Sequence, residues 1–207
     1  MSYKKLILTS AGEDRLEKLI GERLKKGAHK KLIDKRIWDL FGEDWCVMFT
    51  DLSGFSRQAA RFGMLYFLPS IQESLRPLVP ILLEHLGVLR TVPGDSYLVI
   101  FRNVEKAIHA SIEMEKALVK YNKKKSAEEK VLLCVGLGYG KVLKIGDHDV
   151  YGNEVNAASK LGEDIAKAGE ILVTESVKEN CPKDASCRFE EIKDIPSGAE
   201  KAYRLKY

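Results

Sequence analysis

The run Cys46-Val47-Met48-Phe49 constrains the fold more than any other part of the sequence. Four consecutive apolar residues without polar alternation are typical of a strand that is buried on both faces. Such a strand lies in a sheet that other elements cover on both sides. The run ends at Thr50-Asp51, and Leu52-Ser53-Gly54-Phe55 predicts a turn that leads to a helix N-terminus.

Several segments show the spacing of amphipathic helices, with apolar residues three or four apart among charges. They are residues 13–41, which fit one helix or a helix pair, residues 104–122 and residues 153–168. Residues 56–86 also have helical character but contain Pro69, Pro77 and Pro80. Because three prolines do not fit one unbroken helix interior, we expect two helices divided near Pro69.

The remaining segments read as strands and turns. Val88–Val92 and Tyr97–Phe101 flank the turn-forming Pro93-Gly94-Asp95-Ser96 and predict a β-hairpin with Asp95 at its tip. Further strands are expected over residues 131–140, 171–173 and around 203–205. The order of elements predicts an α+β fold, an antiparallel-rich sheet with helices packed on it.

Composition excludes several classes of protein. No apolar stretch approaches the roughly 18 to 20 residues of a membrane span, and the first ten residues lack the pattern of a secretion signal. A net charge of +4 is too mild to indicate nucleic-acid binding. The four cysteines have no zinc-ribbon spacing and fit a reducing compartment. We therefore expect a cytoplasmic protein without a membrane span or a nucleic-acid partner.

Two aspartates stand where chemistry is expected. Asp51 ends the buried strand and Asp95 lies at the tip of a hairpin that can pair beside it. Two carboxylates brought together repel each other unless a divalent cation neutralises them, which predicts a Mg²⁺ or Mn²⁺ site completed by phosphate oxygens and water. The alternative is a helix-capping Asp51 and a turn-forming Asp95, and spacing alone leaves both interpretations open.

Three blocks of sequence extend this pattern. They are Phe49-Thr50-Asp51-Leu52-Ser53-Gly54-Phe55, Gly94-Asp95 with Phe101, and Asp149-Val150-Tyr151-Gly152 followed by Val155-Asn156-Ala157-Ala158-Ser159. In order and separation they resemble the class III nucleotidyl cyclases, the family of adenylate and guanylate cyclase catalytic domains, whose first block reads F-x-D-[IL]-x-G-F. The resemblance covers about residues 42–207, and residues 1–41 precede it as a helical segment with a regulatory or dimerising role, or one that packs on its own domain.

The resemblance implies a ferredoxin-like core and a head-to-tail homodimer with active sites at the interface. It also implies a phosphorus–oxygen lyase for cyclic nucleotide signalling, in which the ribose 3′-oxygen attacks the α-phosphorus and pyrophosphate leaves. The implied ligands of two Mg²⁺ or Mn²⁺ ions are Asp51, Asp95 and the carbonyl of Leu52. The implied phosphate contacts are Ser53, Gly54 and Phe55.

Four further positions correspond to functional positions of the family, and two of them hold a different residue type. Asn156 matches the asparagine that orients the ribose, although an asparagine near a helix start also suits backbone capping. Lys160 stands where the family usually has an arginine facing the transition-state charge, or is a solvated helix residue. Thr91 and Asp149 occupy the base-binding positions that hold lysine and aspartate in adenylate cyclases. Asp149 can accept from an exocyclic amine such as that of adenine or cytosine, so ATP is the first choice and CTP or another nucleotide stays open. The alternative function, which Lys160 and Thr91 favour, is a degenerate module that binds nucleotide or dimerises without catalysis.

Overall fold

The structure is a computed structural model that describes residues 11–53, 63–91, 94–127, 129–146, 149–182 and 187–207, without the side chains of residues 64, 66, 67, 70, 90 and 91. The expected phosphate contacts Gly54 and Phe55 lie outside the described residues.

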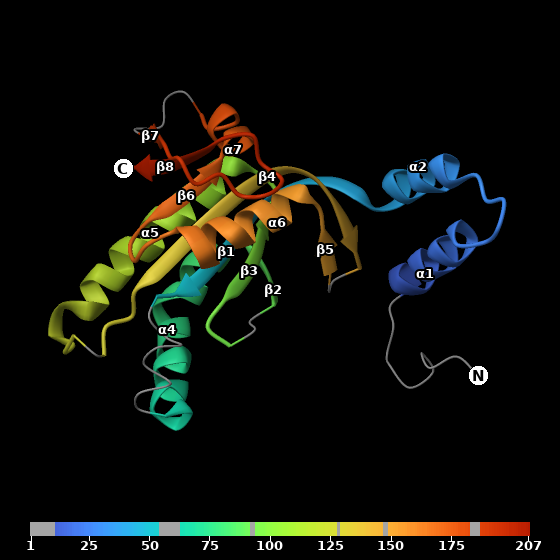
Figure 1. Ribbon diagram of the computed structural model, residues 1–207. Coiled ribbons are helices and arrows are strands. Elements are labelled where there is room, and N and C mark those ends of the chain that lie inside the picture. Colours follow the sequence, from blue (N-terminus) through green and yellow to red (C-terminus); the bar gives the residue numbers. More distant parts are fainter. Residues whose placement is uncertain (1–10, 54–62, 92–93, 128, 147–148, 183–186) are drawn as a thin grey trace.

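Eight strands form one sheet (Figure 1). They are β1 (Gly42–Leu52), β2 (Val88–Thr91), β3 (Tyr97–Phe101), β4 (Leu133–Ile145), β5 (Asp149–Tyr151), β6 (Ile171–Thr174), β7 (Arg188–Glu191) and β8 (Ala202–Lys206). The order across the sheet is β2-β3-β1-β4-β6-β8-β7, with β5 paired to β4. The pair β4–β6 is parallel, and the other pairs are antiparallel.

The helical elements are α1 (Ala11–Arg23), α2 (Lys30–Phe41), α4 (Met64–Glu84), α5 (Val104–Tyr121), the 3₁₀ turn η2 (Asn122–Lys124), α6 (Asn153–Ser159), the π-helical turn η3 (Lys160–Ile165) and α7 (Glu175–Glu179). Successive residues of β1 face opposite layers, as the apolar run predicts. Cys46 and Met48 join the core cluster with α4 and α5, whereas Trp45 and Val47 cluster with Ala158 of α6. The fold is therefore a mixed α+β sheet with helices on both faces.

The predicted division near Pro69 is wrong, because α4 continues through Pro69, Pro77 and Pro80 as one helix of 21 residues. Each proline removes one helical hydrogen bond. Burial of Leu78 and Leu82 against the core opposes that cost, since each fully buried leucine contributes about 2 kcal/mol. Tertiary packing thus decides a helix that local preferences would interrupt.

Other differences concern the ends and edges of the sheet. β5 and β7 were not expected, and β4 extends beyond residue 140 to Ile145. The two unexpected strands are short and largely exposed, so they carry no apolar run that a sequence could reveal. The helix expected over residues 153–168 becomes a short α-helix followed by the π-helical turn η3.

Residues 11–41 form a helix pair, with Gly27 at a φ of 82° in the turn between α1 and α2. The pair lies to one side of the sheet (Figure 1), where Leu19 and Phe41 pack with Ile145 at the far end of β4. Among the described residues, no helix has the length and apolar character needed to cross a bilayer.

Candidate functional site

Strand pairing brings the two predicted metal-binding aspartates to the same corner of the sheet. The register pairs Thr50 of β1 with Tyr97 of β3, so Asp51 and Asp95 follow and precede that pair. The amide of Tyr97 also donates to Thr50 Oγ1 at 3.2 Å, which locks the register at this point. The Ser96 hydroxyl lies 3.5 Å from Asp51 Oδ1. The hairpin therefore places Asp95 beside the end of β1.

The electrostatics of this corner disfavour negative charge. Burial raises the pKa of Asp51 to about 6, and the charges of Asp95 and Glu163 act in the same direction. The pKa of Asp95 is also raised, mainly by burial and further by Glu163. Within the described part of the chain, neither aspartate forms an ion pair with a cationic side chain. The corner thus gathers carboxylates without an internal counter-charge.

Glu163 was missed by the sequence analysis. It lies in η3, and its Oε1 is 3.3 Å from the Ser96 hydroxyl, while the Ser159 hydroxyl donates to its Oε2 at 2.6 Å. The side chain is 67 residues from Ser96 in sequence, so no local pattern connects them.

A glycine contact explains how η3 reaches this corner. A Cβ on Gly162 would lie 2.6 Å from the carbonyl oxygen of Phe49, and a Cβ on Gly136 of β4 would collide with the carbonyl oxygen of Ala158. Both glycines therefore let the helical segment touch β1 and β4 backbone to backbone. The contact fixes Glu163, the next residue, beside the end of β1. This pair of glycines is a signal in the sequence that could have indicated a close approach.

Leu52 and Ser53, two of the other expected contacts, lie at the end of β1 and directly after it. Leu52 is the last residue of β1 and pairs with Leu133. The amide of Ser53 donates to the carbonyl of Leu132 at 2.8 Å, so that amide is already paired within the chain.

Asn156 and Lys160 share one exposed face of the helix, since they are four residues apart. Gly152 is the N-cap of α6, and among the described residues the Asn156 side chain has no hydrogen-bond partner, so the capping interpretation is not observed. Lys160 Nζ lies 2.5 Å from Asp164 Oδ2, and this hydrogen-bonded ion pair raises the pKa of the lysine.

Asp149, one of the two base-binding candidates, is not brought to the aspartates of the same chain. Asp149 pairs with Ile145 of β4, whereas Asp51 pairs with Cys134 near the other end of that strand. At about 3.3 Å per residue, the two positions are roughly 35 Å apart along β4. Asp149 is exposed and accepts a hydrogen bond from the Tyr151 hydroxyl at 3.1 Å. The backbone of Thr91 lies at the end of β2, opposite Leu98.

The residues at the corner fit a hard cation that keeps other ligands. Within the described residues, no three His, Cys, Asp or Glu side chains are grouped closely enough to hold a metal ion. The donors that the sequence predicts here are all oxygen atoms, from the two carboxylates and from the carbonyl of Leu52. Mg²⁺ typically takes one or two carboxylates and completes its shell with phosphate and water, so this donor set suits it.

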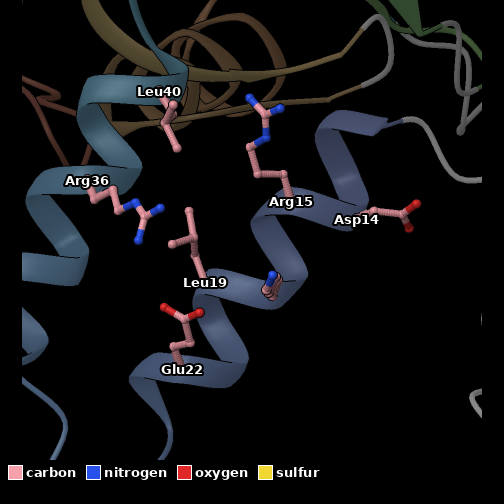
Figure 2. Close-up of a pocket in the computed structure, with 7 residues that line it drawn as sticks. Asp14, Arg15, Leu19, Glu22, Arg36 and Leu40 are labelled. Carbon is pink, nitrogen blue, oxygen red and sulfur yellow. The ribbon is translucent and has the colours of Figure 1, made fainter.

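A separate hollow of about 360 Å³ lies in the N-terminal helix pair. Figure 2 shows the side chains of Arg15 and Arg36 directed into the space between α1 and α2, beside Leu19. β1 begins directly after α2 and carries Asp51 near its opposite end. The hollow is therefore distinct from the carboxylate corner.

The chain has relatives among known proteins. The adenylate and guanylate cyclase catalytic domain family matches residues 42–205. A Myxococcus xanthus protein named serine/threonine-protein kinase pkn2 is 29% identical over 131 residues, which are 63% of this chain and 16% of that protein. An adenylate cyclase from Anabaena cylindrica is 27% identical over 177 residues, which are 77% of this chain and 35% of that protein. The chain thus spans less than half the length of these relatives.

The fold has a counterpart among solved structures. The adenylate/guanylate cyclase/hydrolase from Silicibacter pomeroyi superimposes with a TM-score of 0.66 at 19% identity, covering 80% of this chain and 98% of that chain. The sheet with its two helical layers is therefore the class III cyclase fold. With the family match over residues 42–205, the chain belongs to the adenylate and guanylate cyclase catalytic domain family.

Proposed function

We propose that the protein is a metal-dependent nucleotidyl cyclase that converts a nucleoside triphosphate, with ATP as first choice, into its 3′,5′-cyclic monophosphate and pyrophosphate. The observation that carries the proposal is the convergence of Asp51 and Asp95 at the end of β1, without a described cationic partner, in a chain of the cyclase family. Carboxylates held together against their repulsion are suited to a divalent cation.

Each site residue has a definite task in this reaction. Asp51, Asp95 and the Leu52 carbonyl would hold Mg²⁺ or Mn²⁺. When bound, two such ions lower the pKa of the attacking ribose hydroxyl and neutralise the triphosphate. Ser53, Gly54 and Phe55 are the residues proposed to receive the phosphates. The remaining roles belong to the helix that follows β5.

On that helix, Asn156 would orient the ribose and Lys160 would meet the charge that develops at the α-phosphate. Lys160 has to exchange its partner Asp164 for the phosphate to do so. A lysine keeps the positive charge of the family's arginine but lacks its two-pronged hydrogen bonding, so the proposal includes a slower reaction. Lys160→Arg should then increase the turnover rate.

The separation of Asp149 from Asp51 supports a homodimer. One chain cannot bring both residues to one nucleotide, because they lie near opposite ends of β4. Two chains arranged head to tail would place Asp149 and Thr91 around the base with residues of both partners, and active sites at the interface. In this proposal residues 1–41 are a regulatory or dimerising segment before the cyclase domain of residues 42–207.

The test is to incubate the purified protein with Mn²⁺ or Mg²⁺ and each of ATP, GTP, CTP and UTP, and to identify cyclic products by mass spectrometry. Asp51→Ala should abolish the product. Asp44→Ala is the matched control, because Asp44 is an exposed aspartate on the same strand. A product that persists in Asp51→Ala would contradict the metal assignment.

The second candidate function is a module that binds nucleotide without turning it over. The ion pair of Lys160 with Asp164 favours it, since the charge of the lysine is already balanced by that carboxylate. Saturable nucleotide binding by a folded dimer, with no cyclic product from any of the four nucleotides, would select this function.

A further inference from the structure

The Ser96 hydroxyl lies between two carboxylates. Its oxygen is 3.5 Å from Asp51 Oδ1 and 3.3 Å from Glu163 Oε1, and the residue is 5% exposed. A serine hydroxyl has a single proton, so it can donate to one of these acceptors at a time. Glu163 is the nearer acceptor, and it can keep the hydroxyl when Asp51 turns its oxygens to another ligand.

Glu163 is held in this position from two sides. The Ser159 hydroxyl binds its other carboxylate oxygen at 2.6 Å. The backbone contact of Gly162 with Phe49 anchors the preceding residue against β1. The carboxylate is therefore oriented before any ligand arrives, although it belongs to an exposed residue of η3.

From this arrangement we infer that Glu163 is a positioning residue of the cation site, which acts through Ser96 and through its charge to strengthen the binding of a divalent cation by Asp51 and Asp95. The inference rests on the proposed function, because it assumes that the two aspartates bind the cation. Glu163 is not assigned as a direct ligand, which agrees with the lack of a three-residue metal cluster among the described residues.

The size of the effect follows from distance and screening. Asp51 Oδ1 and Glu163 Oε1 contact the same hydroxyl oxygen, so they lie within about 7 Å of each other. A unit charge at about 7 Å from a dication in a largely aqueous setting changes its affinity by roughly fivefold to tenfold. The loss of an outer partner of a metal ligand typically has an effect of similar or larger size.

The experiment is a titration of the purified full chain with Mn²⁺ in the absence of nucleotide, in which the free ion is measured by electron paramagnetic resonance. Glu163→Gln keeps the shape and removes the charge, and we expect about fivefold to tenfold weaker binding. Asp164→Asn is the matched control, since it removes one negative charge a single residue further on. We expect its Mn²⁺ affinity to stay within about twofold of the wild type.

Asp51→Asn distinguishes a failure of the role of Glu163 from a failure of the cation site itself. If it abolishes Mn²⁺ binding while Glu163→Gln binds like the wild type, the role of Glu163 is overturned and the cation site stands. If Asp51→Asn binds like the wild type, the metal assignment of the proposed function fails as well. Equal losses of Mn²⁺ affinity in Glu163→Gln and Asp164→Asn would show that the effect comes from net charge alone, and would overturn the inference. A wild type that does not bind Mn²⁺ without nucleotide would also overturn it.

Discussion

Glu154 of α6 and Asp51 of β1 are both partly buried carboxylates, but they differ in the hydrogen-bond donors and charges around them. Glu154 Oε2 accepts hydrogen bonds from the Tyr139 amide and the Thr174 hydroxyl, each at 3.0 Å. Burial raises the pKa of Glu154, and these donors oppose the shift. Asp51 has the distant Ser96 hydroxyl and the Leu52 amide, and two further carboxylates that repel it.

The difference shows how structural and functional carboxylates can be told apart. Glu154 has its hydrogen bonds satisfied by the fold, so its charge serves to join α6 to β4 and β6. Asp51 keeps a charge that the described residues do not balance, so its partner has to come from outside. Buried acidic residues become site candidates when the chain leaves them short of donors, and not because they are buried.

The largest expected effect is on the catalytic rate, on substitution of Asp51. Asp51→Asn should lower the rate of cyclic nucleotide formation by about 1000-fold or more, because a neutral amide is a poor ligand for a hard cation. Product formation by mass spectrometry under saturating Mn²⁺ measures the loss. Asp44→Asn on the same strand should retain the rate, and an equal loss there would point to a folding defect.

Substitution of Glu154 should instead lower the stability of the folded protein. Glu154→Ala leaves the Tyr139 amide without its acceptor and leaves the Thr174 hydroxyl with Ser176 Oγ alone, which should lower the free energy of unfolding by about 2 to 3 kcal/mol. Denaturant unfolding followed by circular dichroism measures the change. A loss below about 0.5 kcal/mol would mean that water replaces the carboxylate, and that Glu154 does not differ from a surface residue.

A third carboxylate, Glu115 of α5, sharpens the comparison. It is 6% exposed, its Oε1 has no partner among the described residues, and burial raises its pKa to about 7. The folded state therefore binds more protons than the unfolded state between pH 4.5 and about 7, and stability falls as pH rises through this window. Glu115→Met should be more stable than the wild type by about 2 kcal/mol at pH 8. The gap should shrink towards pH 5, and thermal melts that show the same gap at both pH values would contradict this.

The smallest effect concerns Asp51 without metal. Its pKa of about 6 exceeds its ordinary value, so ionisation destabilises the folded state as pH rises from about 4 to 6. Because Asp51 is half-exposed and screened by solvent, we expect Asp51→Asn to stabilise the metal-free protein by about 1 kcal/mol at pH 8. This corresponds to a rise in melting temperature of roughly 2 to 4 °C in EDTA. Unchanged melting would show that the repulsion is relieved by solvent.

Local patterns predicted the parts of the fold that local forces determine. The hairpin around Asp95 follows from turn-forming residues between two apolar runs. The helix after it begins where Asn103 accepts a hydrogen bond from the Lys106 amide at 2.9 Å. The convergence of Asp51 and Asp95 was also expected, because antiparallel pairing of the hairpin with β1 sets the start of β3 against the end of β1.

The parts that were missed depend on distant contacts. The course of α4 through three prolines depends on its burial against the sheet, which no local preference reports. Glu163 reaches the site because Gly162 and Gly136 let a helical segment touch two strands, and because η3 opens the helix by one wider turn, in which the Ala166 amide bonds to the Leu161 carbonyl. The two glycines indicate close packing, but only the assembled sheet shows which side chain this packing places beside the end of β1.

The junction between α2 and β1 carries a pair of natural spectroscopic reporters. The chain contains two tryptophans, and they flank this junction. Trp38 is 37% exposed on α2, while Trp45 is 5% exposed in β1 beneath the guanidinium of Arg102, 3.8 Å from its ring centre. Their emission should therefore differ in wavelength and in access to soluble quenchers. Fluorescence of the unlabelled protein can thus distinguish a displacement of the N-terminal helices from the opening of the sheet.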